Sequence, residues 1–527
     1  MRNPMSEPVI ELTQVVKRFG DHAVLDGLSL VIERGTSTVI MGESGSGKSV
    51  LIRLMNGLSL PDSGSVRLFG QETAKISRAE LRKLRLRVAT LFQNYALFDS
   101  MTVAENIAFP MVENGRADRA TIDKRVQELL ELLKLSDAAH LIPSELSGGM
   151  KKRVSLARAL ITDPEVVLFD EPTTGLDPVM IEFVDTMLLD IRQRFSITSV
   201  IISHDMASAF RLGDSLAMLH KGHITFRGTP EEARNTDVAE VRRFTDSASS
   251  RLGAENETIA EAEPDAPSTG LTWEQLPVPP EEPVVRVRDL NKSFGDRKVL
   301  RGMNMYVLPG KVTTLIGGSG SGKTVMMKHI LGLFTPDSGS VEVFGRDLAS
   351  LTAPERVQTR LRFGMLFQGA ALFDSMSILE NVAFPLIEAP NAKPVGRAKA
   401  LEMAHETLTR LKIDNLGARM PAEISGGQKK RVGLARAIVA NPDIIIYDEP
   451  TTGLDPVMTS YVNDMIVEAQ AEFGTTALIV SHDMASTFRI SQWIAMLYLG
   501  EIIAFGTPDD IRASEHPRVR EFIFAGA

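Results

Sequence analysis

The sequence predicts an α/β fold with parallel sheets, and it predicts that this fold is built twice. Short apolar runs at residues 37–41 and 312–316 each lead into a glycine-rich loop and then into a helical pattern. Continuous apolar runs at residues 166–169 and 444–447 have the composition of strands that are covered on both faces. Such strands are typical of parallel sheets between layers of helices. Each half of the chain therefore predicts one α/β domain.

The repeat extends far beyond the loops. Lys48 and Lys323 lie 275 residues apart, and Asp170 and Asp448 lie 278 apart, which leaves a length difference of three residues between the two copies. A repeat of this period indicates a tandem of whole domains. Two stretches have the apolar spacing of amphipathic helices in an inserted helical region, namely residues 122–135 and 401–411.

An abrupt change in composition separates the two copies. Between them the chain is rich in acidic residues, serine and proline, and such a stretch buries too little apolar surface to offset its ordering entropy. We therefore expect a first domain at residues 1–245, a flexible acidic linker at residues 246–283 and a second domain at residues 284–527. Trp273 and Leu276 are the linker side chains able to dock on a domain.

Bulk properties exclude several classes of protein. The net charge of −9 and the pI near 5.7 argue against a nucleic-acid binder, whose phosphate contacts need a basic surface. The absence of cysteine excludes disulfides and thiolate metal sites. The N-terminal residues lack the apolar core of a signal peptide, and no apolar run reaches the roughly 18 residues of a membrane-spanning helix. We therefore expect a cytosolic protein that reaches the membrane through a partner.

Two loops, at residues 42–49 and 317–324, match the phosphate-binding pattern G-x-x-x-x-G-K-[ST]. In this pattern the glycines let backbone N–H groups close around phosphates, the lysine reaches the β and γ oxygens, and the hydroxyl ligates Mg²⁺. The pattern predicts that ATP is bound by Gly42, Gly45, Gly47, Lys48, Ser49, Gly317, Gly320, Gly322, Lys323 and Thr324.

An acidic pair follows an apolar strand in each copy. Asp170 precedes Glu171, and Asp448 precedes Glu449. The aspartate is placed to hold Mg²⁺, and the glutamate is placed to polarise the attacking water. This division suits phosphoryl transfer, which depends on positioning and charge neutralisation. The sequence therefore predicts ATP hydrolysis in both halves.

Residues 146–150 and 424–428, Leu-Ser-Gly-Gly-Met and Ile-Ser-Gly-Gly-Gln, resemble the signature of ABC-transporter ATPases. A Ser-Gly-Gly at a helix N-terminus offers free N–H groups to a γ-phosphate. The resemblance implies nucleotide contacts from Ser147, Gly148, Gly149, Ser425, Gly426, Gly427 and Gln428. It also implies Q-loop residues Gln93 and Gln368, catalytic switch histidines His204 and His482, and adenine-stacking Phe19 and Phe294. The Mg²⁺ ligands that it implies are Ser49, Gln93, Asp170, Thr324, Gln368 and Asp448.

The resemblance also implies an architecture. Each half becomes a nucleotide-binding domain with a RecA-like parallel-sheet core, an antiparallel β subdomain and an inserted helical subdomain. The two halves form a head-to-tail intramolecular pair, in which the phosphate loop of one half meets the signature of the other. Because Glu171, Glu449, His204 and His482 are all present, we expect two hydrolytic sites. Met150 replaces the usual glutamine and cannot donate the amide hydrogen bonds that Gln428 can, which introduces a modest asymmetry between the two signatures.

Three tasks are compatible with a tandem ATPase that has no membrane span. An ABC-F ribosome-associated ATPase normally has a long, charged helical pair between its domains and the sequence Asn-His-Leu-Asp, whereas this chain has an acidic, Pro-rich linker and Thr-Gly-Leu-Asp twice. A tandem ATPase of a small-solute (sugar) importer typically has a degraded second site, which this chain lacks. A motor subunit of a membrane transporter remains the third task.

The segments at residues 96–110 and 371–385 are nearly identical and resemble the ATPase subunit of Mla/Mce-type phospholipid transporters. Residues 143–150 and 516–522 carry the same resemblance. It implies a peripheral ATPase on the cytoplasmic face of the inner (plasma) membrane. The implied partners are integral-membrane permease subunits, an Mce-domain lipid-binding protein and a STAS-domain protein. The fusion of two halves departs from the separate, homodimeric ATPase of that family.

Overall fold

The computed structural model describes residues 8–43, 45–91, 96–115, 118–146, 148–249, 270–388 and 395–525. These residues divide into two compact units, one formed mainly by the chain up to Ser249 and the other mainly by the chain that follows. Among the described residues, none of the helices combines the length and the apolar character that a bilayer crossing requires.

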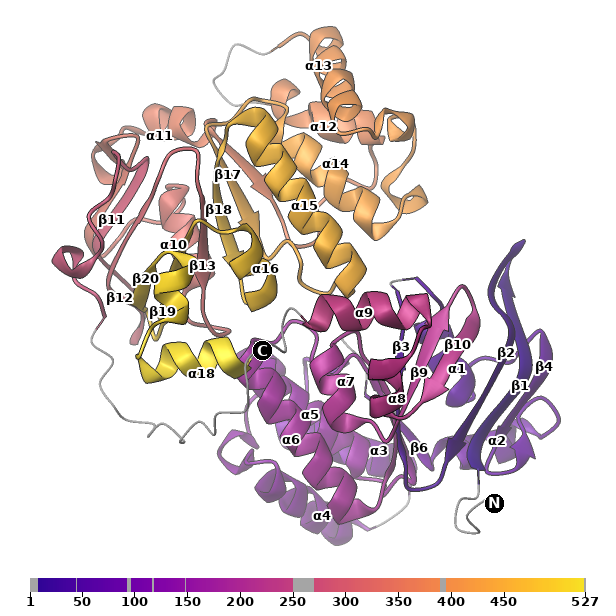
Figure 1. The fold of residues 1–527 in the computed structure, drawn as a ribbon. Coiled ribbons are helices and arrows are strands. Elements are labelled where there is room, and N and C mark those ends of the chain that lie inside the picture. The colour runs from indigo at the N-terminus through magenta and orange to yellow at the C-terminus, as the bar shows by residue number, and fades with distance from the viewer. Residues whose placement is uncertain are drawn as a thin grey trace. The chain divides into compact units, whose positions relative to one another are not determined.

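The first unit contains two sheets (Figure 1). The antiparallel sheet has the order β2-β1-β4-β5, and the larger sheet has the order β10-β9-β3-β8-β7-β6, in which β10 pairs antiparallel and the other strands pair parallel. The strands are β1 (Pro8–Phe19), β2 (His22–Glu33), β3 (Ser37–Met41), β4 (Ser63–Leu68), β5 (Gln71–Glu72), β6 (Val88–Leu91), β7 (Val166–Asp170), β8 (Thr198–Ile202), β9 (Ser215–His220) and β10 (His223–Gly228). The helices are α1 (Lys48–Met55), α2 (Arg78–Arg85), α3 (Val103–Glu113), α4 (Arg119–Leu132), α5 (Gly148–Leu160), α6 (Pro178–Phe195), α7 (Met206–Leu212), α8 (Pro230–Asn235) and α9 (Ala239–Ser249).

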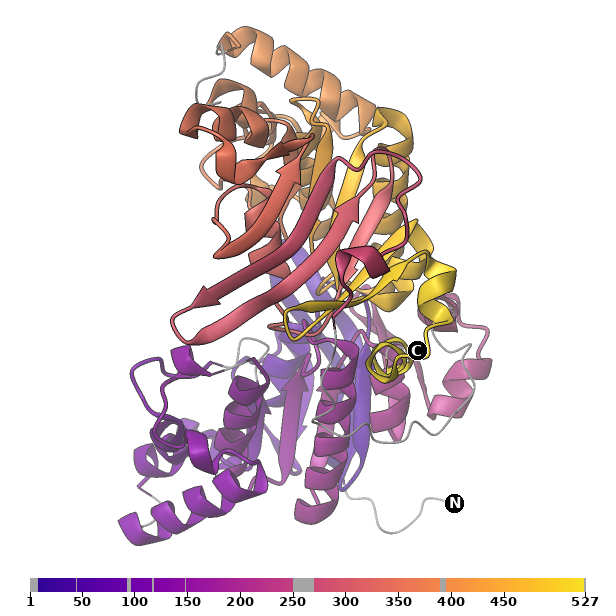
Figure 2. The ribbon, with the colours of Figure 1, turned by 90° about the vertical axis from the view of Figure 1, so that its left-hand side faces the viewer.

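The second unit repeats this plan. Its antiparallel sheet has the order β12-β11-β14-β15, and its larger sheet has the order β16-β17-β18-β13-β19-β20. Figure 2 shows the two long strands β11 and β12 side by side as a hairpin. The strands are β11 (Val285–Phe294), β12 (Arg297–Val307), β13 (Val312–Ile316), β14 (Ser338–Val343), β15 (Arg346–Asp347), β16 (Phe363–Leu366), β17 (Ile444–Asp448), β18 (Thr476–Ser481), β19 (Trp493–Tyr498) and β20 (Glu501–Gly506). The helices are α10 (Lys323–Ile330), α11 (Ala353–Arg360), α12 (Ile378–Ile387), α13 (Arg397–Arg410), α14 (Gly426–Ile438), α15 (Pro456–Phe473), α16 (Met484–Ile490), α17 (Pro508–Arg512) and α18 (Pro517–Ala525).

The predicted α/β fold class is confirmed in both units. The apolar runs predicted as strands form β3, β7, β13 and β17, and every residue of β3 and β13 is buried. Their continuous apolar sequence follows from this position, since a central parallel strand has no solvent-facing side. The carboxyl ends of these strands therefore meet at one edge of the sheet, where the glycine-rich loops and the acidic pairs begin.

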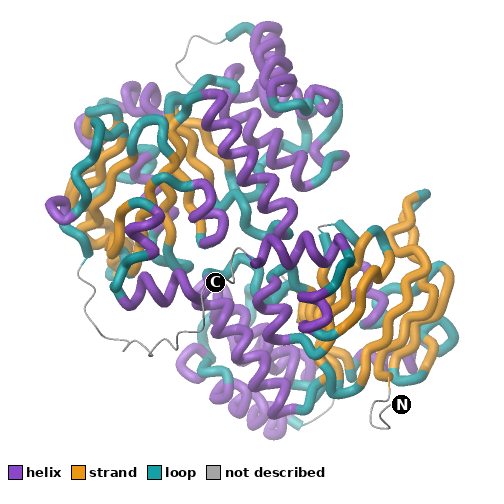
Figure 3. Tube along the Cα trace, viewed as in Figure 1, coloured by secondary structure: helices purple, strands orange, loops and turns teal. Residues whose placement is uncertain are grey.

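The inserted helical region of each unit carries no strand among its described residues (Figure 3). In the second unit, α12, α13 and α14 share one apolar core. The predicted helices overlap α4 and α13, but both observed helices begin and end earlier than expected. Helix α4 begins at Arg119, because the Asp118 side chain accepts a hydrogen bond from the Thr121 backbone N–H at 2.9 Å and caps it.

Helices α3 and α12 were not expected. Each opens with a capping box, in which Thr102 pairs with Glu105 and Ser377 pairs with Glu380. This signal is readable in the sequence as Thr or Ser followed three residues later by Glu. A proline inside each helix, Pro110 in α3, obscures it because proline normally ends a helical pattern.

The predicted flexible linker needs a correction over its second part. Residues 250–269 lie outside the described part of the chain. Residues 270–283, here called the strap, lie on the second unit: the Leu271 N–H donates to the carbonyl of Ile502 on the edge strand β20 at 2.6 Å, and Leu276 is 7% exposed within the main core. The acidic, Pro-rich composition concealed apolar anchors whose burial favours ordering.

Aromatic rings hold the strap in place. Trp273 packs against Tyr306 with ring centroids 6.3 Å apart, and the Arg288 guanidinium lies 4.4 Å from the Trp273 ring. The Tyr306 hydroxyl donates to the Pro277 carbonyl at 2.9 Å. Tyr306 also contacts Trp493 and Phe505, at centroid distances of 5.6 and 4.6 Å. The strap is therefore part of the second unit's fold, and at the other end of the predicted linker α9 runs on to Ser249.

Candidate functional site

The glycine-rich loop of each unit joins a buried strand to a helix. Gly42 follows β3 and has a φ of 156°, and a side-chain Cβ there would lie 2.3 Å from the carbonyl oxygen of Leu219. Gly317 follows β13 in the same way, with 2.2 Å to the Leu497 carbonyl oxygen. Only glycine fits so close to a neighbouring backbone. The other loop glycines predicted from the pattern also have positive φ angles: Gly45, Gly47, Gly320 and Gly322.

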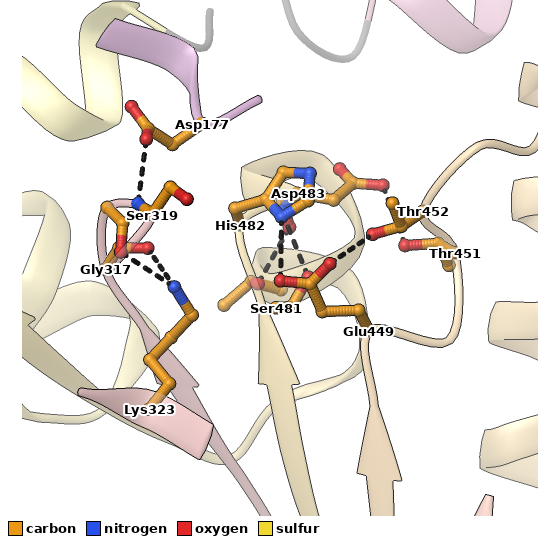
Figure 4. Close-up of polar contacts among 12 residues, drawn as sticks. Asp177, Gly317, Ser319, Lys323, Glu449, Thr451, Thr452, Ser481, His482 and Asp483 are labelled. Atoms are coloured by element: carbon orange, nitrogen blue, oxygen red, sulfur yellow. Dashed lines mark hydrogen bonds and ion pairs between the residues drawn. The ribbon is translucent and has the colours of Figure 1, made fainter. Parts of the chain in front are cut away.

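The loop lysine of each unit is fixed by the loop itself. The Lys48 ammonium donates to the carbonyls of Gly42 and Glu43 at 2.7 and 2.8 Å. The Lys323 ammonium donates to those of Gly317 and Gly318 at 2.7 and 2.9 Å (Figure 4). Burial lowers the pKa of both lysines. Each loop therefore encloses one cation, held at the end of the central strand.

The hydroxyl residues of the loops lie next to these lysines. Ser49 and Thr324 occupy the first turns of α1 and α10 and are exposed. Ser46 and Ser321 each have a buried hydroxyl with no hydrogen-bond partner among the described residues. Orphaned polar atoms beside a buried cation indicate a site for a polar, anionic ligand.

The acidic pairs lie at the ends of β7 and β17. Burial raises the pKa of Asp170, and the neighbouring Glu171 raises it further; Asp448 behaves in the same way. Glu171 and Glu449 adopt left-handed φ angles of 51° and 46°, an uncommon conformation for non-glycine residues and one that recurs at functional sites.

A histidine faces each of these glutamates. The Nδ1 of His204 lies 3.5 Å from the Glu171 carboxylate, and that of His482 lies 3.4 Å from the Glu449 carboxylate (Figure 4). Burial is the largest single influence and acts to raise the pKa of Glu171, but the hydrogen bond and charge of His204, the hydrogen bond from Thr174 and the charge of Lys48 together outweigh it, and the pKa is lowered. The pKa of Glu449 is lowered for the same reason. Both carboxyls are therefore held as carboxylates.

Sequence reasoning missed two threonines that orient the carboxylates. The hydroxyls of Thr174 and Thr452 donate to Glu171 and Glu449 at 2.8 and 3.1 Å. The repeated Glu-Pro-Thr-Thr sequence is the signal that could have identified them. Their hydrogen bonds fix one carboxylate oxygen of each glutamate.

Two buried lysines were also missed. Lys152 on α5 donates to the backbone carbonyls of Pro172 and Thr174, and Lys430 on α14 donates to that of Gln368. Burial lowers the pKa of both lysines to about 8. Their burial could not be predicted, because Lys-Lys-Arg on a helix ordinarily indicates a solvated face.

The signature residues lie at the N-termini of α5 and α14, and not all of them are among the described residues. Ser147 and Gln93 lie outside the described residues, whereas Gly148 and Gly149 begin α5. In the second unit Ser425 caps α14, ahead of Gly426 and Gly427, and its N–H donates to the Gln428 side-chain oxygen at 2.9 Å. The Gln428 side-chain oxygen therefore acts as an acceptor. Met150 has no oxygen to take this role.

The remaining predicted residues lie at the rim of each unit. Phe19 ends β1 and is 55% exposed, and Phe294 ends β11 and is 46% exposed. Gln368 follows β16 and is exposed. Exposed aromatic side chains of this size are available to a flat ligand. We call the loop, acidic pair, histidine and exposed phenylalanine of the first unit the first centre, and those of the second unit the second centre.

The family model for ABC transporters matches residues 25–174 and 300–452. The chain belongs to the ABC transporter family. Similar proteins include the oligopeptide transport ATP-binding protein OppD of Mycobacterium tuberculosis, 28% identical over 96% of each chain. The glutathione import ATP-binding protein GsiA of Escherichia coli O157:H7 is 29% identical over 95% of this chain and 86% of its own. The nucleoside import ATP-binding protein NupA of Lactococcus lactis is 27% identical over 97% of each chain.

As an ABC transporter ATPase with two family domains, the protein binds ATP, hydrolyses it and couples hydrolysis to transport together with membrane permease subunits. None of the three relatives named above is a phospholipid transporter by its description. The prediction that the chain is a tandem ABC ATPase is confirmed. The assignment to the Mla/Mce type remains a prediction.

Proposed function

We propose that the two centres each bind and hydrolyse MgATP, in a first domain that continues to Ser249 and a second domain that includes the strap, and that the chain drives a lipid-moving transporter. The observation that carries the hydrolytic part is the duplicated geometry. In both units a buried lysine ammonium and a carboxylate held by a histidine and a threonine lie at the carboxyl ends of the parallel strands, and an exposed phenylalanine ends a strand of the antiparallel sheet.

Each residue type has a physical role in this proposal. Phe19 and Phe294 stack on adenine, and Lys48 and Lys323 neutralise phosphate charge. The carboxylates of Glu171 and Glu449 accept a proton from the attacking water, while His204 and His482 orient those carboxylates and stabilise the γ-phosphate. The lowered pKa of the glutamates keeps them able to accept a hydrogen bond from water.

The residues present fit a magnesium ion. Mg²⁺ prefers oxygen ligands and is usually held by one or two carboxylates together with substrate phosphates. The Ser49 hydroxyl and the Asp170 carboxylate would hold it in the first centre, and Thr324 and Asp448 would hold it in the second. The implied ligands Gln93 and Gln368 complete the two sets. The ion would neutralise charge on the phosphates when bound.

We further propose that the phosphate loop of each half works with the signature of the other. In this arrangement ATP joins Lys48 to Ser425, and a second ATP joins Lys323 to Ser147. Closure around ATP moves the permease, and hydrolysis reopens the pair. Met150 in one signature and Gln428 in the other support an inequality between the two sites.

The lipid assignment rests on one repeated loop and helix. Asn106 is fully buried, and its amide donates to the carbonyls of Phe98, Met101 and Thr102 at 3.0 to 3.1 Å. Asn381 makes the matching set in the second unit. Phe98 and Phe373 remain 41% exposed. This fixed loop supports a docking role for the segments that resemble Mla/Mce-type ATPases, with a permease, an Mce-domain protein and a STAS-domain protein as partners.

A small-solute importer is the second candidate. It is favoured by the relatives, whose names describe import of oligopeptides, glutathione and nucleosides. In that case the same two centres would power uptake through a different permease. Both candidates place the chain on the cytoplasmic face of the inner membrane.

Hydrolysis is tested by replacing both glutamates. In the Glu171→Gln/Glu449→Gln chain we expect ATP turnover, measured as phosphate release, to fall by about 100-fold or more, because the carboxylate that accepts the proton is lost. ATP binding should persist. Glu128→Gln, an exposed change on α4, is the matched control and should leave turnover intact. Unchanged turnover in the double variant would overturn the assignment of the two glutamates.

The cargo is tested by affinity purification of the full chain from gently solubilised membranes, with mass spectrometry of proteins and lipids. Recovery of a permease, an Mce-domain protein and bound phospholipid is the expected result. Recovery of a permease with a soluble-solute receptor would transfer the assignment to the importer candidate, and recovery of ribosomes would overturn both.

A further inference from the structure

Both units hold their exposed phenylalanine through the same ion pair. Lys17 binds Asp62 at 2.8 Å, and Lys292 binds Asp337 at 2.8 Å. The same aspartates accept the backbone N–H one residue before the phenylalanine, both at 2.6 Å. The pair ties the end of β1 or β11 to the loop that follows α1 or α10. The backbone under Phe19 and Phe294 is therefore fixed alike in the two halves.

The second unit adds two rings that the first lacks. Phe334 contacts Phe294 edge to face, with ring centroids 5.5 Å apart. On its other side Phe334 contacts His329, with centroids 5.7 Å apart and planes at 72°. The ammonium of Lys328 lies 5.2 Å from the Phe334 ring. Three rings thus form one row, which ends at the exposed phenylalanine.

The inner end of this row is rigid. His329 is 1% exposed, and its Nδ1 lies 2.8 Å from the Val325 carbonyl oxygen, which can only accept a hydrogen bond. Nδ1 therefore carries the proton, and the buried Nε2 has no hydrogen-bond partner among the described residues. Burial lowers the pKa of His329 and favours the neutral ring. The hydrogen-bonded imidazole packs against the side of Phe334 that is turned away from Phe294.

The first unit has no equivalent row. The positions that correspond to Phe334 and His329 are Ser59 and Leu54. Within the described chain, no aromatic ring pairs with Phe19, and the Lys17 ammonium lies 5.9 Å from its ring centroid, much as Lys292 lies 5.7 Å from that of Phe294. Its side chain is accordingly more exposed than that of Phe294, at 55% against 46%.

We propose that Phe334 is a positioning residue that holds the Phe294 ring ready for the adenine ring, so that the second centre binds ATP more tightly than the first. This inference rests on the proposed function, in which Phe294 stacks on adenine. Ordering a side chain at a binding site costs about 0.5–1.5 kcal/mol, and a ring already ordered avoids that cost. Such a difference corresponds to about a three- to tenfold difference in affinity.

The test uses the full chain with the first centre silenced by Lys48→Ala. Binding of ATP and of inorganic tripolyphosphate, which carries no base, is measured by calorimetry. We expect Phe334→Ser, which copies the first unit, to weaken ATP binding about three- to tenfold. It should leave tripolyphosphate binding unchanged. Phe334→Tyr keeps the ring and should restore the affinity for ATP.

The outcomes separate this inference from the proposed function. If Phe294→Ala weakens ATP binding but Phe334→Ser does not, the positioning role is wrong and the adenine site stands. If neither variant affects ATP binding, the adenine-stacking role itself is wrong. If Phe334→Ser weakens ATP and tripolyphosphate equally, its effect is on the fold and the inference is overturned.

The reverse graft tests the same idea in the other half. In a chain whose second centre is silenced by Lys323→Ala, Ser59→Phe together with Leu54→His should strengthen ATP binding to the first centre, with tripolyphosphate unchanged. Ser59→Leu is the matched control, because it adds apolar volume without a ring. An equal gain with leucine would show that volume, and not the row of rings, accounts for the difference.

Discussion

Strands β10 and β20 occupy the same place at the edge of their sheets, but one is half exposed and the other is buried. On β10 the outward side chains are polar, with His223, Thr225 and Arg227 at its alternate positions. On β20 the positions of Thr225 and Arg227 are taken by Ile503 and Phe505, which are 5% and 7% exposed. The strap covers β20, and no described segment covers β10 in this way.

The two halves therefore differ in the residues that surround and stabilise their sheets, while the lysine, glutamate and histidine of the two centres are the same. The lysine, glutamate and histidine geometry of the two centres agrees within 0.1 Å for the Glu–His pair. An edge strand with a free row of backbone groups is a liability for pairing with other chains. In the first unit the edge strand β10 carries polar side chains, and in the second unit the strap covers the edge strand β20.

The largest expected effect comes from removing the strap's buried anchor. Leu276→Ala should destabilise the second unit by about 3 kcal/mol, because it leaves a cavity in the main core. The chain's two tryptophans, Trp273 and Trp493, both lie in the ring cluster under the strap, so urea unfolding followed by tryptophan fluorescence reports this unit. Val278→Ala is the control, since Val278 is 89% exposed. Equal midpoints for the two variants would show that the strap does not support the fold.

The two units also differ in a buried polar residue that contacts the helix after the switch histidine, α7 in the first unit and α16 in the second. Asp185 on α6 is fully buried and accepts from the Ser208 hydroxyl at 2.8 Å and from Arg211 at 3.1 Å. The corresponding residue of the second unit is Asn463, which donates to the Ser486 hydroxyl at 2.8 Å. Burial raises the pKa of Asp185 to about 7. One unit therefore has a titratable group where the other has an amide.

Asp185→Asn should remove a pH dependence from the first unit. A carboxyl whose pKa is raised by folding holds a proton that the unfolded chain releases, so stability is lost as pH rises from about 4 to about 7. The advantage of the variant should grow by about 2 kcal/mol between about pH 5 and about pH 7, given about 1.4 kcal/mol per pKa unit. Urea unfolding by circular dichroism measures this change. Asn463→Asp should create the opposite trend in the second unit, and parallel pH profiles in all three chains would contradict the assignment.

Much of the fold was predictable because its signals are local. The buried strands β3 and β13 and the loops after them were predictable from continuous apolar runs and glycine patterns, and duplication excluded chance matches. The ordered strap was not, because acidic and proline residues dominate its composition, while its stability depends on contacts with Tyr306 and β20 that are distant in sequence. Tertiary packing overrides local composition in such segments.

In the candidate site, too, the residues that belong to local motifs were predictable and most of the others were not. Lysine, glutamate and hydroxyl positions follow from motifs whose spacing is fixed by strand-to-helix turns. Lys152 and Phe334 were missed because each acts on a partner from another part of the chain, and no local pattern marks them. Thr174 was missed although it binds Glu171 three residues away and lies in the repeated Glu-Pro-Thr-Thr sequence. The aligned halves offer one remaining signal: positions where they differ, such as Phe334 against Ser59, indicate where supports have diverged.

The smallest expected effect comes from removing one hydrogen bond, between the Tyr306 hydroxyl and the strap. Tyr306 stands where the first unit has Val31, and its hydroxyl serves the strap through Pro277. Tyr306→Phe should destabilise the second unit by about 1 kcal/mol, the usual net value of one buried hydrogen bond, without loosening the ring cluster. Tyr498→Phe is the matched control, because it removes the hydroxyl of another partly buried tyrosine of the same unit, on β19. Burial raises the pKa of Tyr306 to about 12, which keeps the hydroxyl a donor up to strongly alkaline pH. The gap between the two variants in urea midpoint should therefore persist from neutral pH to about pH 10, whereas the absence of a gap at neutral pH would show that the strap is held by ring packing alone.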